Sequence, residues 1–388
     1  MTAAVDDRFV RSTPLEVASG WAYGLKPEKP MPAVSATPRE MLDNAIRPAL
    51  QSGRCYVTFS GGRDSSAVLA AATSLARRED LPLPIPVTKT YPDIPDTDES
   101  DWQQLVIDHL GLTDWIRLEF RDGESDLLGA AARKSLKKNG LMWPPALQTQ
   151  STVYEHLQEG CLLTGEGGDA VFGMRRVTPL TVMRRRRRFD RLVVTEALKG
   201  VLPRPARRAL SARREHSSLL RPWLRPDALK QHAKLAAADD AERPLRYDHG
   251  TWFLGRQRFW SVADTNQREA AAEYGIRTAD PLLDPGFLAA LAEFGGAWGF
   301  TGRTAAMRAL FSDVLPAAVL ARKTKAAFNR AFTGPGTLGF AESWDGTGVD
   351  TDLVDPEVLR TLWHSTSPTT PAGMLLHSAW LASEEAAQ

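Results

Sequence analysis

Short apolar runs alternate with longer amphipathic segments over the first half of the chain. The apolar runs are β-branched or aromatic and are bounded by Gly, Pro or polar residues, which predicts strands. The predicted strands are residues 55–59, 83–90, 115–118 and 161–163. The predicted helices between them are residues 64–78, 96–110, 124–138 and 148–158. This alternation predicts an α/β fold with a doubly wound parallel sheet, in which ligands bind beyond the carboxyl ends of the strands.

The pattern changes along the chain and divides it into four parts. Residues 1–36 are rich in Pro, Ala and Ser, so we expect an irregular N-terminal arm. A helix should begin at Thr37, because Thr37 can cap it, Pro38 suits its first turn and Glu40 completes a reciprocal cap. From about residue 250 the pattern is mostly helical, with loops near 301–303 and 333–350. The parts that we expect after the arm are an α/β core at 37–174, a basic helical insertion at 175–250 and a helical C-terminal part at 251–388.

Composition and charge exclude several classes of protein. The 388 residues are 43% hydrophobic and 24% charged, which is ordinary for a globular chain with a proper core. No apolar run is long enough to predict a membrane span, and the N-terminus has no signal-peptide pattern. Cys55 and Cys161 each lie in or beside a predicted strand, which favours two buried thiols over a disulfide or metal site. These features predict a cytoplasmic protein.

The net charge of +1 conceals a strongly basic segment. Residues 175–225 contain sixteen Lys and Arg against three acidic residues, and Arg184 to Arg188 are consecutive. A solvated helix face is one interpretation of this run, and a docking surface for an acidic partner is the other. The near-neutral total charge and the absence of an RNA-binding module argue against nucleic acid.

A glycine turn follows the predicted strand 55–59 and opens the next helix. Two glycines let the backbone approach a ligand, and the amides and dipole of the helix start favour phosphate. Asp64 would repel a phosphate unless a Mg²⁺ ion lay between them, so this residue predicts a metal ligand. An ordinary turn with a serine cap is the alternative. The candidate phosphate-binding residues are Ser60, Gly61, Gly62, Asp64, Ser65 and Ser66.

A second glycine turn follows the predicted strand 161–163 and repeats the same arrangement. Gly165 and Gly167 flank Glu166, and Asp169 follows at the start of a helix. Asp169 could supply a second carboxylate to the same Mg²⁺ ion, or it could act only as a helix cap.

These two motifs together resemble those of a known family. Residues 60–65, Ser-Gly-Gly-Arg-Asp-Ser, resemble the pyrophosphate-binding loop of ATP pyrophosphatases, and residues 164–169, Thr-Gly-Glu-Gly-Gly-Asp, resemble the synthetase domain of asparagine synthetases. The resemblance implies an adenine-nucleotide α-hydrolase-like fold that binds ATP. It also implies that Asp64 and Asp169 hold Mg²⁺ and that Glu166 lies near the reacting centre.

Two later segments extend the resemblance. Residues 274–284 are similar to a family block, but Arg277 and Ala279 stand where asparagine synthetases have Glu and Arg, which argues against aspartate as the substrate. Residues 315–328 resemble the closing basic motif of the family, in which the lysine that matches Lys325 contacts pyrophosphate. Arg322 and Lys323 are further candidates for ATP binding, and a solvated basic helix end is the alternative.

The resemblance implies an amide synthetase that forms an acyl-adenylate and then transfers the acyl group to an amine. The carboxylate substrate could be a small molecule or a peptide. Only 36 residues precede the matching region, so we expect no glutaminase domain, and we expect a role in natural-product or antibiotic biosynthesis. The alternatives are a lasso-type peptide cyclase and a non-catalytic ATP-binding regulator.

Overall fold

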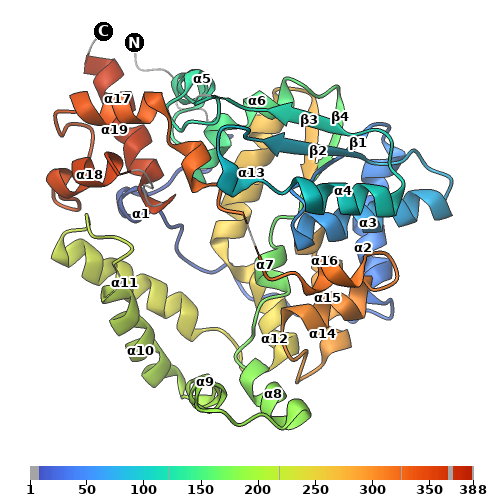
Figure 1. The fold of residues 1–388 in the computed structure, drawn as a ribbon. Helices are drawn as coiled ribbons and strands as arrows, with labels where there is room; N and C mark the ends of the chain where they lie inside the picture. Colours follow the sequence, from blue (N-terminus) through green and yellow to red (C-terminus); the bar gives the residue numbers. More distant parts are fainter. Residues whose placement is uncertain (1–7, 122, 218, 325, 366–369, 387–388) are drawn as a thin grey trace.

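Five parallel strands form one sheet at the centre of the α/β part, in the order β3-β2-β1-β4-β5 (Figure 1). This arrangement comes from a computed structural model that describes residues 8–121, 123–217, 219–324, 326–365 and 370–386. The strands are β1 (Cys55–Thr58), β2 (Ile85–Thr90), β3 (Ile116–Glu119), β4 (Gly160–Leu163) and β5 (Ile276–Ala279). The predicted α/β fold with a parallel sheet is therefore confirmed.

Helices surround this sheet and make up most of the remaining chain (Figure 1). The helices up to the second glycine turn are α1 (Pro14–Ser19), α2 (Pro38–Gln51), α3 (Arg63–Arg78), α4 (Ser100–Leu110), α5 (Ala130–Asn139), α6 (Ser151–Tyr154) and α7 (Gly168–Val171). Those of the middle are α8 (Thr178–Arg186), α9 (Arg191–Val201), α10 (Arg204–His216), α11 (Pro226–Ala241), α12 (Tyr247–Trp252) and α13 (Arg258–Ala272). The last are α14 (Pro285–Gly295), α15 (Arg303–Phe311), α16 (Ala317–Ala321), α17 (Pro335–Ser343), α18 (Pro356–Trp363) and α19 (Gly373–Ala386).

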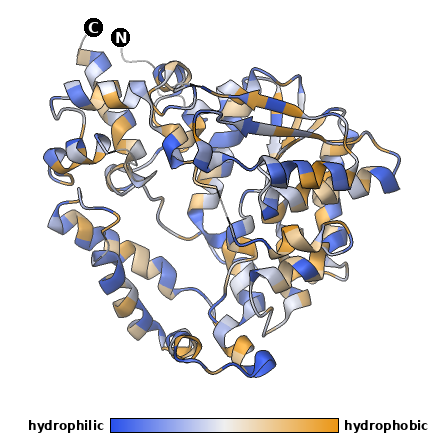
Figure 2. Cartoon of the chain, in the orientation of Figure 1, coloured by the Kyte–Doolittle hydropathy of each residue, from blue (hydrophilic) through white to orange (hydrophobic). Residues whose placement is uncertain are grey.

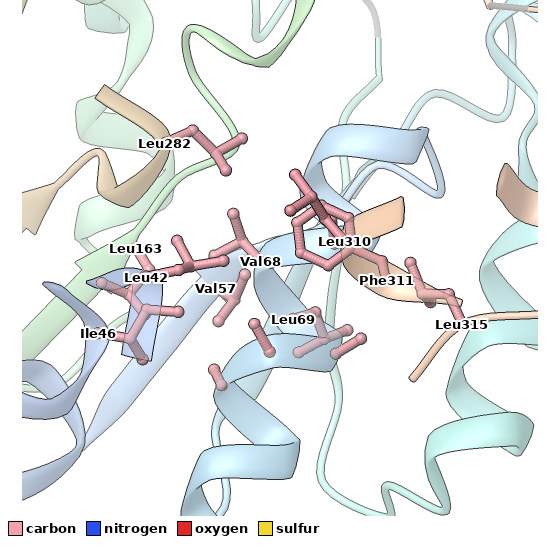
Figure 3. Close-up of a cluster of buried hydrophobic side chains, with 14 of the residues drawn as sticks. Leu42, Ile46, Val57, Val68, Leu69, Leu163, Leu282, Leu310, Phe311 and Leu315 are labelled. Carbon is pink, nitrogen blue, oxygen red and sulfur yellow. The ribbon is translucent and has the colours of Figure 1, made fainter. Parts of the chain in front are cut away.

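The largest apolar core lies between one face of the sheet and helices α2, α3, α14 and α15 (Figure 3). Alternate residues of a strand point to opposite faces, so Cys55 and Val57 of β1 enter this core while Tyr56 enters the core on the other face. That second core is aromatic and includes residues of α6 and α13. The residues that Figure 3 labels are Leu42, Ile46, Val57, Val68, Leu69, Leu163, Leu282, Leu310, Phe311 and Leu315.

A third core joins the N-terminal arm to the C-terminal helices. Leu15 and Ala18 of α1 are buried with Trp223, Trp363 and Trp380, which come from three different segments. Within the arm, α1 is a short ordered piece that begins with a complete reciprocal cap and packs against α19.

The basic segment forms α8 to α10, which lie apart from the sheet, and Figure 2 shows hydrophilic residues along them (Figures 1 and 2). Three arginines of the consecutive run contact the protein itself. Arg184 stacks on Trp298, Arg185 donates to the Gly299 carbonyl oxygen at 2.8 Å, and Arg188 pairs with Asp190. Arg186 and Arg187 are exposed. Part of the run is therefore structural.

Several expected boundaries were wrong. The helix expected at 124–138 begins only at Ala130, because residues 123–129 form turns closed by backbone bonds such as Asp126 N to Gly123 O. The helix expected from 96 begins at Ser100, and the one expected at 148–158 is the single turn α6. Strand β5 and helix α17 occur where a helical segment and a loop were expected.

Two other expectations were correct. The start of α2 has both reciprocal bonds between Thr37 and Glu40. Cys55 and Cys161 are buried free thiols on adjacent strands, and burial raises the pKa of both. In the part of the chain that the structure describes, no helix is both long and apolar enough to cross a bilayer.

Phe172 should be a major contributor to stability, because its ring contacts those of Phe287 and Phe311 and so ties α7 to α14 and α15. The substitution Phe172→Ala would leave a cavity and is expected to lower the free energy of unfolding by about 3–5 kcal/mol. Urea denaturation measures this change. The matched control is Phe189→Ala at an exposed site, which should change it by less than about 0.5 kcal/mol. Equal effects of the two substitutions would contradict the assignment.

Candidate functional site

A cavity of about 640 Å³ opens at the carboxyl ends of the strands, where both glycine turns lie. Strands β1 and β4 are adjacent, with Val57 opposite Leu163, so the turns that follow them start at the same level. The polar lining includes Ser60, Gly62, Asp64, Ser65, Lys89, Gln150, Thr164, Gly165, Glu166, Asp169, Gln267, Arg303, Arg322 and Lys323.

The first turn is built to present amide groups at the start of α3. Gly62 is the cap residue, and no side chain closes this end of the 16-residue helix, so the first amides remain available to a ligand. The Ser60 hydroxyl accepts from Gly62 N at 3.3 Å and lies 3.2 Å from the Ser65 hydroxyl. An anion at this point would meet backbone donors, two hydroxyls and the positive end of the helix dipole.

The second turn packs directly against the first. A Cβ atom on Gly165 would lie 2.8 Å from Ser65 N, and one on Gly168 would lie 2.3 Å from Asp64 Cγ. Neither position has room for a side chain, so the glycines allow the two loops to touch. This contact accounts for Gly165 and Gly168 in the second turn, whereas a Cβ atom on Gly61 of the first turn would meet Gln103 and Glu99 instead.

The two carboxylates meet at one guanidinium. Arg303 at the start of α15 donates from Nη2 to both oxygens of Asp64 at 2.6 Å, and its Nη1 contacts Asp169. Burial raises the pKa of the Asp64 carboxyl, and the nearby positive charge of Arg303 partly offsets this. The predicted convergence of Asp64 and Asp169 is therefore present, although they lie 105 positions apart.

Sequence reasoning treated residues 301–303 as a loop and missed Arg303. Nothing local marks it as a site residue, because its partners are far away in the chain. The arginine shows that the two carboxylates can surround one cation, and hard oxygen ligands of this kind suit Mg²⁺. In the described ranges no group of three or more His, Cys, Asp or Glu side chains could hold a metal, so further ligands would have to come from a bound phosphate or water.

The residues of the basic motif 322–325 have different roles. Arg322 is buried, pairs with Glu99, donates to the Gly61 carbonyl oxygen at 3.0 Å and stacks on Trp102. It therefore holds the first turn in place and has little freedom to follow a ligand. Lys323 is exposed and lines the cavity. Lys325, the predicted catalytic cation, lies outside the described residues.

Glu166 lines the cavity beside a buried carboxyl group that sequence reasoning did not single out. Its amide donates to Thr164 Oγ1 at 3.0 Å, and that hydroxyl donates to Asp280 at 2.5 Å. Burial, together with the nearby charge of Glu166, raises the pKa of Asp280 to about 6, and the hydrogen bond from Thr164 partly offsets this rise. The end of β5 therefore adds a second acidic group behind Glu166.

The structure brings most of the predicted site residues to one cavity. Ser66 is the clearest exception, because it is fully buried and does not line the cavity. Gly61 and Gly167 shape their turns, and both have left-handed backbone conformations, with φ of 78° and 81°. Their role is therefore in the path of the backbone.

Comparison with known proteins places the chain in a family. The family model described as asparagine synthase matches residues 37–382. No curated protein matches the chain significantly.

Gly168 tests whether the contact between the loops matters for ligand binding. The substitution Gly168→Ala would force the Asp64 carboxylate to move, with strain of about 1–3 kcal/mol. We expect MgATP to bind about 10- to 100-fold more weakly by titration calorimetry. The control is Gly339→Ala in α17, where no atom lies within 4 Å of the new methyl group. Unchanged binding in Gly168→Ala would show that Asp64 does not depend on this contact.

Asp280 should make stability depend on pH. In the unfolded chain an aspartate ionises near pH 4, but here its pKa is about 6, so folding takes up a proton between these values. The stability that this group contributes is present below pH 4 and is lost as the pH rises through about 6. Relative to Asp280→Asn, wild-type protein should lose about 2–3 kcal/mol of unfolding free energy between pH 4 and 7. Urea denaturation across this range measures it, and a constant difference would exclude the shift.

Proposed function

Because the chain belongs to the asparagine synthase family, whose members are ATP-dependent carbon–nitrogen ligases, we propose that it is an AMP-forming amide synthetase. It adenylates a carboxylate and then transfers the acyl group to an amine or related nitrogen nucleophile. The observation that carries this proposal is the position of Asp64 and Asp169. Both carboxylates bind the guanidinium of Arg303, and they line a cavity beside the N-terminus of α3, which no side chain caps.

In the first step the substrate carboxylate attacks the α-phosphorus of ATP and pyrophosphate leaves. The amides at the start of α3 and the hydroxyls of Ser60 and Ser65 would hold the phosphates. Asp64 and Asp169 would hold Mg²⁺, which supplies positive charge next to the phosphate oxygens. Lys325, with help from Lys323, would stabilise the charge that develops on the leaving pyrophosphate.

In the second step the amine attacks the acyl carbon and AMP leaves. Glu166 would orient the amine or accept its proton, because it lines the same cavity and because the bond from its backbone amide to Thr164 fixes the turn that carries it. The carboxylate must lie in line with the α-phosphorus and the leaving pyrophosphate, and the amine must lie beside the acyl carbon. Binding in one common cavity would hold the reacting groups in these positions.

The acid substrate is proposed to differ from aspartate. Arg277 is exposed on β5 and does not line the cavity, and Ala279 has no ionisable group. The charged pair that asparagine synthetases place in this block is therefore missing here. A natural-product acid or a peptide carboxylate is the proposed substrate.

The experiment that tests the function is exchange of labelled pyrophosphate into ATP with a panel of carboxylic acids. We expect exchange that requires both an acid and Mg²⁺. Lys325→Ala should slow it by about 100-fold or more, as for the loss of one charge-stabilising donor. Lys323→Ala is the matched control, two residues away, and should slow it less than about tenfold.

Other outcomes identify the alternatives. Cyclisation of a precursor peptide with AMP release would assign the chain to the lasso-type cyclases. Release of ADP and phosphate would contradict adenylation. Absence of both exchange and ATP binding would favour the regulatory homologue.

An acidic partner could bind the arginine run, and we propose Arg186 and Arg187 as the residues that would contact it. The other three arginines already contact Trp298, Gly299 and Asp190.

A further inference from the structure

Lys89 is a positive charge on an otherwise apolar face of the sheet. Val87 and Lys89 of β2, followed by Tyr91 just after the strand, alternate onto the face that lines the cavity. The hydroxyl of Thr88 points the other way and donates to the Phe59 carbonyl oxygen at 2.7 Å. Phe59 directly precedes the first glycine turn, so Lys89 lies at the same edge of the sheet as the phosphate-binding loop.

The surroundings of Lys89 supply no negative charge. Its ammonium group lies 3.3 Å from the Gln150 side-chain oxygen and 5.7 Å from the centre of the Phe120 ring. No carboxylate in the described ranges forms an ion pair with it. Loss of water lowers the pKa of Lys89 to about 8. The neighbouring apolar residues on this face are Tyr56, Val87, Tyr91, Leu118, Val153, Tyr154 and Leu162.

This arrangement costs stability unless an anion joins it. Lys89 is half-buried and lines the open cavity, and a partly desolvated ammonium group without a counter-charge is unfavourable relative to an aliphatic side chain at this strand position. Two other cations of the site have acidic partners within the protein: Arg322 has Glu99, and Arg303 has Asp64 and Asp169. Lys89 differs because its one polar partner is the neutral Gln150.

We propose that Lys89 and Gln150 bind the carboxylate of the acid substrate, and that this substrate is an organic acid with an apolar or aromatic body. The proposal rests on the proposed function and specifies the substrate class. The phosphates of ATP have their own donors at the start of α3, whereas Lys89 lies among Val87, Val153 and Tyr154. A pocket of a few hundred Å³ with an apolar lining and a few converging polar groups is typical of small-molecule sites.

Binding of matched acid and amide probes tests this assignment without turnover. The pairs are benzoate, phenylacetate, 3-phenylpropionate and hexanoate, each with its primary amide, titrated by calorimetry in the presence of MgATP with a methylene group between the α- and β-phosphates. At least one acid should bind wild-type protein tenfold or more tightly than its amide. Lys89→Met should abolish this preference and leave the affinity for the nucleotide within twofold.

The controls separate this inference from folding and from the proposed function. Lys230→Met, at an exposed lysine of α11, should keep the preference. Lys89→Gln replaces Lys89→Met if the latter does not fold. No acid preference in the wild type, or a preference that survives in the Lys89 variant, overturns the inference. Nucleotide binding that weakens tenfold with Lys89→Met overturns it too, because Lys89 would then serve ATP. Pyrophosphate exchange in wild-type protein decides the proposed function separately.

Discussion

The site depends on the direct contact between two glycine turns. Val57 and Leu163 are opposite each other on adjacent parallel strands, so the turns leave the sheet at the same level and meet. Their contact is possible only because Gly165 and Gly168 have no side chains beside Ser65 and Asp64. Once the turns meet, two acidic side chains from distant parts of the chain face the same space. The sheet thus sets the position of the charges, and the glycines set how closely they approach.

The charges around the cavity fall into two groups with different physical roles. One group is paired within the protein: Arg322 with Glu99 fixes the first turn, and Arg303 offsets part of the charge of Asp64 and Asp169. The other group faces the cavity with neutral neighbours, and Lys89 with Gln150 is its clearest member. Charge pairs of the first kind define the shape of the site. Charges that face the cavity without a counter-charge, such as Lys89, would determine which ligands bind, because a ligand of opposite charge offsets the cost of their desolvation.

Sequence reasoning succeeded where the signal was local. The strand at 55–58, the reciprocal cap at Thr37 and the acidic residues after both glycine turns all follow from neighbouring residues. It failed where contacts between distant parts of the chain determine the structure. Strand β5 has only four residues, and its pairing with β4 is not encoded in the segment itself. Arg303 is 239 positions from Asp64, so no local pattern could connect them.

Arg303 also has a consequence for the order of events in the site. Its guanidinium and a divalent ion would compete for the same carboxylate oxygens, so a free metal ion can bind only at the cost of the bonds that Arg303 makes with Asp64 and Asp169. Asp64 and Asp169 would hold a metal ion more readily when phosphate oxygens supply its remaining ligands, because the two carboxylates alone must give up Arg303 to bind it. Metal and nucleotide would therefore strengthen each other's binding by an equal factor, as linkage requires. The arginine would act as an exchangeable counter-ion that keeps the aspartates together until both arrive.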